Sequence, residues 1–117
     1  MSEAAASHPA APGEHESMAS IFAALGDETR LRLVTRLSAG GPMSIAHLTS
    51  GGSVTRQAVT KHLQVLAEQG LAHSTRAGRE TVWSLEPQPL QAARACIDDI
   101  SAQWDQALGR LKQFVER

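Results

Sequence analysis

Five polar side chains between residues 56 and 64 have the types and the spacing to recognise a nucleic acid, provided that this segment is an α-helix. At about 100° per residue they fall within a sector of about 140° on the helical wheel, opposite Val59, Leu63 and Leu66. Arginine, lysine, glutamine and threonine form hydrogen bonds with phosphate oxygens and with base edges in the major groove. The five candidate residues are Arg56, Gln57, Thr60, Lys61 and Gln64.

An ordinary solvated helix surface is the alternative interpretation of this polar face. Such surfaces usually combine acids and bases in ion pairs four residues apart, but here two cations occur with no acid before Glu68. The net charge of the whole chain is only −1, but its distribution is uneven. Residues 30–79 contain seven cations and one acid, whereas residues 1–29 contain five acids and no Lys or Arg. Positive charge is therefore concentrated around the polar face, as binding to a phosphate backbone requires.

Hydrophobic spacing predicts two helices in the first third of the chain. The first covers about Ser17–Leu25 and ends at Gly26. The second begins after Asp27, whose side chain can cap it, and stops at the AGG sequence of residues 39–41. The residues of the second helix expected to point into the core are Leu31, Val34 and Leu37.

A helix-turn-helix is expected next. Ser44 can cap a short helix, and the glycine-containing loop of residues 49–53 follows it. Thr55 can cap the longer helix that carries the polar face, and Gly70 can end that helix. In this arrangement the second helix enters the major groove of DNA, so we include Thr55 among the expected DNA contacts.

Residues 71–85 are predicted to form a β-hairpin. Two runs with β-branched or aromatic residues lie on either side of the sequence RAGRE. Arg76 and Arg79 bracket the tip of this hairpin, where they could reach phosphates or an adjacent minor groove. A charged turn that only maintains solubility is the alternative, but the neighbouring helix is also basic. A hairpin beside a helix-turn-helix is a wing.

The C-terminal segment predicts a helix with an apolar face too long for a small core to cover. Pro87 and Pro89 break the chain before it, and eight apolar residues from Leu90 to Val115 then recur at intervals of three and four. About 27 residues at 1.5 Å each form a rod of roughly 40 Å. Such a face usually packs on a copy of itself, and the first helix is short enough to join that interface. The expected interface residues are Ile21, Phe22, Ile97, Ile100, Trp104, Leu108 and Leu111.

The chain is long enough for one domain, which we place at residues 17–117, after a disordered Ala- and Pro-rich tail at residues 1–16. Its N-terminus has acids and no hydrophobic h-region, which makes it a poor signal peptide, and the sequence contains no apolar run that could span a membrane, so we expect a cytoplasmic protein without a membrane partner. Cys96 is the only cysteine, which excludes a disulfide within one chain. We expect it to be a small buried residue, although a redox or metal role across two subunits stays open.

Catalytic motifs are missing from the sequence. It contains no nucleophile elbow, no phosphate-binding glycine loop, no metal-ligand pair four residues apart and no two acids placed with a histidine. We therefore predict that the protein is not an enzyme and that it needs no cofactor.

Three segments of the sequence resemble the ArsR/SmtB family of winged-helix repressors: ALGDETRLRLVTRL (24–37), TRQAVTKHLQVLAEQGL (55–71) and RAGRETVWSL (76–85). The resemblance runs from about Ser17 to Arg117. It implies a mainly α winged helix-turn-helix of four helices, a β-hairpin and a fifth helix, assembled as a homodimer through the first and last helices. It also implies an imperfect palindromic DNA operator, released when a small effector of unknown identity binds.

The sequence departs from the metal sensors of this family. Ser44 and Ala46 stand at the positions where the arsenic and cadmium sensors have two cysteines. Asp98 and Asp99 lie on the last helix, but residues 90–117 contain no histidine that could complete a zinc site with them. The sequence thus resembles the metal-independent members, and we predict no metal site.

Two functions remain in competition at this stage. The first is a dimeric, sequence-specific DNA-binding repressor that contacts the groove through the polar helix and the wing. The alternative is a winged-helix module whose basic face binds an acidic protein partner. Salt-dependent binding to duplex DNA distinguishes the two, because only the first function requires it.

Overall fold

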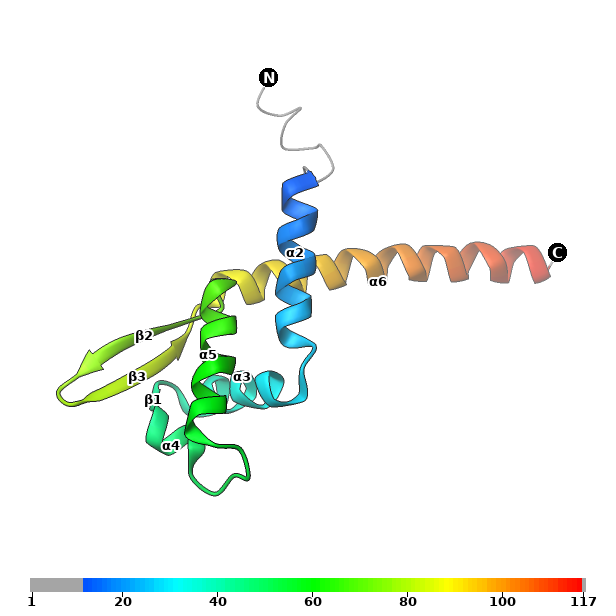
Figure 1. Cartoon of the computed structure of the whole chain (residues 1–117). Helices are drawn as coiled ribbons and strands as arrows, with labels where there is room; N and C mark the ends of the chain where they lie inside the picture. The colour runs from blue at the N-terminus through cyan, green and yellow to red at the C-terminus, as the bar shows by residue number, and fades with distance from the viewer. Residues whose placement is uncertain (1–11, 117) are drawn as a thin grey trace.

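The computed structural model describes residues 12–116 and shows a mainly helical fold with a small antiparallel sheet (Figure 1). In chain order the elements are α2 (Pro12–Leu25), α3 (Glu28–Gly40), β1 (Met43–Ser44), α4 (Ile45–Thr49), α5 (Arg56–Glu68), β2 (Ala72–Ala77), β3 (Glu80–Leu85) and α6 (Pro87–Glu116). The expected order of four helices, a hairpin and a final helix is confirmed. The short strand β1 is an addition to it.

Hydroxyl and carboxylate side chains cap the three helices for which caps are predicted. The Asp27 carboxylate accepts a hydrogen bond from the backbone N–H of Arg30 at the start of α3, at 3.0 Å. Ser44 caps α4 in the same way, and Thr55 caps α5 by accepting from the backbone N–H of Ala58 at 3.1 Å. Each cap provides a partner for an N–H group that has none within the helix.

Two helices begin at a proline, earlier than predicted. Helix α2 begins at Pro12 instead of Ser17, and α6 begins at Pro87, so that Pro89 also lies in its first turn. The prediction that Pro87 and Pro89 lie before the last helix is wrong. The backbone N–H groups of a first helical turn have no partner within the helix, so proline, which lacks this N–H and has a fixed φ near the helical value, is favoured there. Of the predicted tail, residues 1–11 lie outside the described residues.

The wing is a three-stranded antiparallel sheet in the order β1-β3-β2. Strands β2 and β3 pair from Ala72 with Leu85 at the base to Ala77 with Glu80 at the tip. Gly78 opens the two-residue turn with a φ of 65°, a conformation that glycine adopts without strain. Strand β1 joins the outer side of β3 and connects the wing to the start of α4.

One apolar core joins α2, α3, α4, α5 and the base of the wing. The predicted inward face of α5 is confirmed, since Val59, Leu63 and Leu66 are all buried. In α3 the prediction for Leu31 is wrong, because this side chain is 51% exposed and Leu33 is buried instead. Steps of three residues rotate by about −60° each, which places Leu31 about 120° from Leu37, whereas Leu33 lies only about 40° from it.

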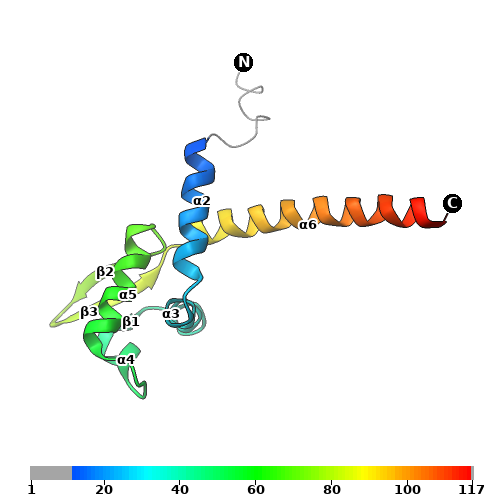
Figure 2. The ribbon, with the colours of Figure 1, turned by 45° about the vertical axis from the view of Figure 1, so that its right-hand side comes forward.

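Helix α6 leaves the globular part of the molecule and projects away from it (Figures 1 and 2). Its first turns pack on the core, where Ala93 is buried and Leu90 is half-buried. Beyond them the helix has few neighbours, and the long dimension of the molecule reaches 66 Å. The apolar side of this projecting segment is therefore open to solvent in a single chain.

Candidate nucleic-acid interface

The polar face of α5 is presented outward. Arg56, Gln57, Lys61 and Gln64 are exposed, and Thr60 is half-buried. Opposite them, Leu63 and Leu66 have no exposed surface, so packing against the core fixes which side of the helix turns outward. The predicted division of α5 into a core face and a polar face is thus present in the structure.

The first two turns of α5 border an open hollow on the surface, lined by Thr55, Arg56, Gln57, Ala58, Thr60 and Lys61. The two threonines already use part of their hydrogen-bonding capacity. The Thr60 hydroxyl donates to the Arg56 carbonyl at 2.8 Å, and the Thr55 hydroxyl accepts from the backbone as the helix cap. Thr60 therefore offers acceptor lone pairs, and Thr55 retains its O–H as a donor.

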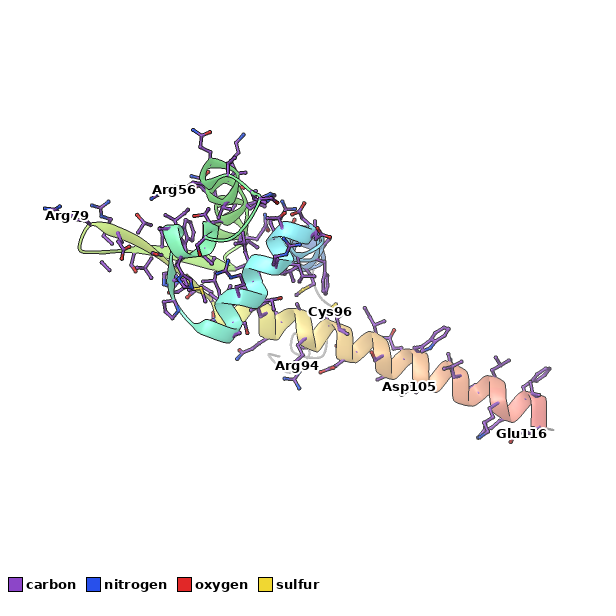
Figure 3. All side chains as sticks on the ribbon, turned by 90° about the horizontal axis from the view of Figure 1, so that it is seen from below. Arg56, Arg79, Arg94, Cys96, Asp105 and Glu116 are labelled. Carbon is purple, nitrogen blue, oxygen red and sulfur yellow. The ribbon has the colours of Figure 1, made fainter. Side chains whose placement is uncertain are left out.

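The arginines of the wing lie apart from α5 in the chain but at the same end of the molecule. Arg76 is exposed on β2, and Arg79 is exposed in the turn at the tip. Figure 3 shows Arg79 and Arg56 at the end of the molecule opposite the free end of α6. No ion pair links Arg56, Lys61, Arg76 or Arg79 to another residue that the structure describes. These four exposed cations are therefore available to pair with a polyanion.

Two of the seven cations in residues 30–79, Arg30 and Arg36, bind backbone carbonyls of neighbouring helices. The Arg36 guanidinium donates to the Leu48 carbonyl at 2.9 Å and to the His47 carbonyl at 3.3 Å, which fixes the end of α4. The Arg30 guanidinium donates to carbonyls at the end of α2. Sequence reasoning missed these roles, because nothing near either arginine in the chain indicates a distant carbonyl partner.

Most of the residues predicted for subunit contact are exposed along α6: Ile97 (48%), Ile100 (54%), Trp104 (63%), Leu108 (44%) and Leu111 (57%). Ile21 is 8% exposed within the core of its own chain and offers little surface to a partner, so its part in the interface stays a prediction. Phe22 is half-buried against the same core. Sequence reasoning missed Phe114, which is 71% exposed and lies about 80° from Trp104 on the wheel.

The part of the chain that the structure describes contains no group of three or more His, Cys, Asp and Glu side chains able to hold a metal ion. Within the same residues, no helix is both long and apolar enough to cross a bilayer. Cys96 is half-buried on α6. His73 pairs with Glu86 at the base of the wing, with 3.0 Å between Nδ1 and Oε1, and both side chains are about half exposed.

A helix-turn-helix followed by a β-hairpin wing, with a polar face on its second helix that carries no acid before Glu68, defines the class of winged helix-turn-helix DNA-binding domains. A family model described as a helix-turn-helix domain matches residues 25–75, which include the turn and both of its helices.

Known proteins identify the family within this class. The chain is 37% identical over 93 residues to the HTH-type transcriptional regulator Rv2034 of Mycobacterium tuberculosis, covering 80% of this chain and 83% of that one. It is 30% identical to the arsenical resistance operon repressor of Escherichia coli, covering 68% of each. A solved ArsR-like transcriptional regulator from Rhodococcus superposes with a TM-score of 0.73 at 36% identity, covering 87% of this chain and 95% of that one. The chain belongs to the ArsR/SmtB family of DNA-binding transcriptional regulators.

Proposed function

We propose that this protein is a dimeric repressor that binds an imperfect palindromic operator in double-stranded DNA. The observation that carries the proposal is the exposed polar face of α5, on which Arg56, Gln57, Lys61 and Gln64 stand with no acid before Glu68 at the C-terminal end of the helix. The assignment as a repressor, rather than an activator, follows the E. coli relative named as one.

Within this proposal, α5 contacts the base edges of the DNA and the wing contacts its sugar-phosphate backbone. Gln57, Thr60, Lys61 and Gln64 enter the major groove, where amide and cationic side chains distinguish base edges. Thr55 and Arg56 lie at the N-terminal end of α5, where hydroxyl, guanidinium and helix dipole all favour a phosphate. Arg76 and Arg79 reach the backbone or the adjacent minor groove from the wing.

The apolar face of α6 supports pairing with a second copy of the chain. Its spacing is symmetric about Trp104, because apolar residues occur four, seven and eleven positions away in both directions. These residues are Ile100, Ile97 and Ala93 on one side and Leu108, Leu111 and Val115 on the other. Two antiparallel copies related by a two-fold axis at Trp104 would therefore place apolar residues opposite each other at every level.

The charges that flank this face support the same antiparallel arrangement. Asp98 and Asp99 lie on the half of α6 nearer the core, and Arg110 and Lys112 lie toward its free end. With the axis at Trp104, an antiparallel pair places Asp98 of one helix level with Arg110 of the other, although Arg94 and Glu116 add one charge of the opposite sign to each half. A parallel pair would instead bring like charges together, which is unfavourable.

The remaining parts of the proposal concern location and regulation. A repressor of this kind acts in the cytoplasm, where the operator DNA is, and a small effector of unknown identity releases it. Ser44 and Ala46 provide no thiolates, so we assign no metal to the α4 region. Cys96 has no second cysteine in its own chain and carries no assigned role.

Gel-shift titration of the purified protein tests this function. DNA fragments that the protein retains from genomic DNA are sequenced, and the affinity for the recovered site is compared with that for a random duplex at several salt concentrations. We expect a palindromic site, a preference for it of at least 10³-fold, and affinity that falls steeply with salt. Equal affinity for both duplexes would remove sequence-specific repression from consideration. Absence of any salt-dependent duplex binding would favour the protein-binding alternative.

A further inference from the structure

Three segments of the chain meet at the guanidinium group of Arg30, which belongs to α3. Its Nε donates to the Ala24 carbonyl at 2.7 Å, and one terminal nitrogen donates to the Ala23 carbonyl at 3.4 Å, both at the end of α2. The other terminal nitrogen lies 3.3 Å from Nδ1 of His62 on α5, a hydrogen bond when Nδ1 carries no proton. Every nitrogen of this side chain thus has a partner outside α3.

Asp27 supports the same contact from the side. Its Oδ2 accepts from the backbone N–H of Arg30 at 3.0 Å and lies 3.8 Å from Nδ1 of His62. The hydrogen bond from the Arg30 backbone lowers the pKa of Asp27, and the charge of Arg30 adds to this effect. At 3.8 Å the carboxylate forms no hydrogen bond with the ring, so Asp27 fixes the backbone of Arg30 and adds a negative charge beside the contact between Arg30 and His62. We call Asp27, Arg30 and His62 the polar bracket.

The polar bracket contacts α5 through His62, away from the polar face of the helix. His62 is half-buried, with 25% of its side chain exposed, and lies on the side of α5 that faces α2 and α3. The next residue toward the N-terminus, Lys61, lies about 100° around the helix and is exposed on the polar side. A tilt or rotation of α5 that displaced His62 would therefore displace Lys61 and the rest of the polar face with it.

We propose that Arg30 is a positioning residue for DNA binding: through the carbonyls of Ala23 and Ala24 and through His62, it sets the orientation of α5 relative to α2. This inference rests on the proposed function. The two copies of α5 in a dimer can enter the major groove at both half-sites of a palindrome only at one separation and one relative angle. Because Phe22 of α2 is one of the expected interface residues, in the proposed dimer the orientation of α5 relative to α2 also sets how each α5 is held with respect to its partner.

The geometry of the contact requires a guanidinium group. Arginine presents its donors in a rigid planar fork, so one side chain can join two carbonyls and an imidazole at once. Lysine keeps the charge as a single point and cannot make all three contacts. Arg30→Lys therefore loosens the polar bracket without changing the net charge that attracts DNA.

The experiment compares Arg30→Lys with Arg32→Lys, a matched control two residues away on the same helix. Arg32 is exposed, and among the described residues its guanidinium forms an ion pair with the exposed Glu28 alone, at 3.4 Å. Affinity is measured by fluorescence anisotropy for a full palindromic operator and for a duplex that carries a single half-site. We expect Arg30→Lys to weaken binding to the full operator about tenfold and to the half-site less than twofold, with Arg32→Lys unchanged on both.

The comparison of the two duplexes separates positioning from folding. A merely structural defect lowers the fraction of active protein and weakens both duplexes equally, which would overturn the inference, as would unchanged binding to both. If Arg30→Lys does not fold, His62→Ala, which leaves both carbonyl bonds in place, is measured in the same way and must show the same split. Failure of the wild-type protein to prefer the operator would instead contradict the proposed function itself.

Discussion

At the scale of single residues, side chains of one type perform different tasks according to what they contact. The guanidinium groups of Arg30 and Arg36 donate to backbone carbonyls and stabilise the junctions between helices. Arg56 and Arg79 are exposed at one end of the molecule and form no ion pair with another described residue. A count of positive charge along the chain includes both kinds, so it locates the basic region without separating its structural arginines from its predicted DNA contacts.

Gln57 is the residue on which sequence preference can be tested most directly. Gln57→Ala removes a side chain that can bond two atoms of an adenine edge, so discrimination between the operator and a mutated operator should fall by roughly 1 to 3 kcal/mol. Gel shifts with both duplexes measure this difference. Gln91→Ala is the matched control, since Gln91 is exposed on α6, away from the polar face. An equal loss of affinity for both duplexes would exclude Gln57 from base recognition.

Asp27 makes stability depend on pH in a defined direction. Its pKa lies below the ordinary value of 3.8, chiefly because the carboxylate accepts the backbone N–H of Arg30. The ionised form is favoured by folding, so its stabilising effect is present above about pH 3.8 and is lost as the pH falls through the lowered folded-state pKa.

Asp27→Asn isolates the charge, because asparagine caps helices as well as aspartate does. Thermal unfolding followed by circular dichroism from pH 7 to pH 2 should show the wild-type protein melting above the variant near neutrality. The gap should narrow below about pH 3.8. A gap that stays constant over the whole range would mean that the charge of Asp27 plays no part in it.

At the scale of elements, the packing of α3 and α5 decides how much each of their leucines contributes to stability. Leu63 has no exposed surface, and Leu31 on α3 is 51% exposed although its spacing predicts burial. Leu63→Ala should lower the free energy of unfolding by about 2 to 5 kcal/mol through lost burial and a cavity. Leu31→Ala should change it by less than about 1 kcal/mol, since little apolar surface is lost. Urea unfolding of both variants decides this, and similar losses would contradict the burial assigned to them.

At the scale of the whole molecule, α6 provides a surface that a single chain leaves open. Five apolar residues from Ile97 to Leu111 are at least 44% exposed along it, and their spacing is symmetric about Trp104. Exposed apolar surface of this extent is characteristic of an interface. The charges of α6 favour an antiparallel partner, so the proposed dimer has its two-fold axis near Trp104.

Cysteine cross-linking tests the position of that axis. In a Cys96→Ser background, Trp104→Cys should form an intermolecular disulfide rapidly on mild oxidation, because residues at a two-fold axis lie opposite their own copies. Gln106→Cys, on the opposite side of α6, is the control and should cross-link slowly. Non-reducing gel electrophoresis measures both rates. Equal cross-linking of the two variants would place the axis elsewhere.

Much of this fold could be predicted from local patterns. The caps Asp27, Ser44 and Thr55, the core face of α5 and the hairpin of residues 71–85 all follow from residues close together in the chain, and the structure confirms them. The starts of α2 and α6 were harder to predict, because a proline is compatible with both the end of a loop and the first turn of a helix. The polar face of α5 was predictable, and its contact with DNA stays a prediction.

Features that join distant residues required the folded chain. His62 is one of five histidines and has no ligand-type neighbour nearby in the sequence. Only the packing of α5 on α2 and α3 brings its ring to Arg30, 32 residues away. The burial of Ile21 in its own core and the exposure of Leu31 likewise depend on where neighbouring elements lie. Helical period and capping are local properties that one segment carries alone. Which side chain meets which carbonyl is set by packing between segments, and that information is spread over the whole chain.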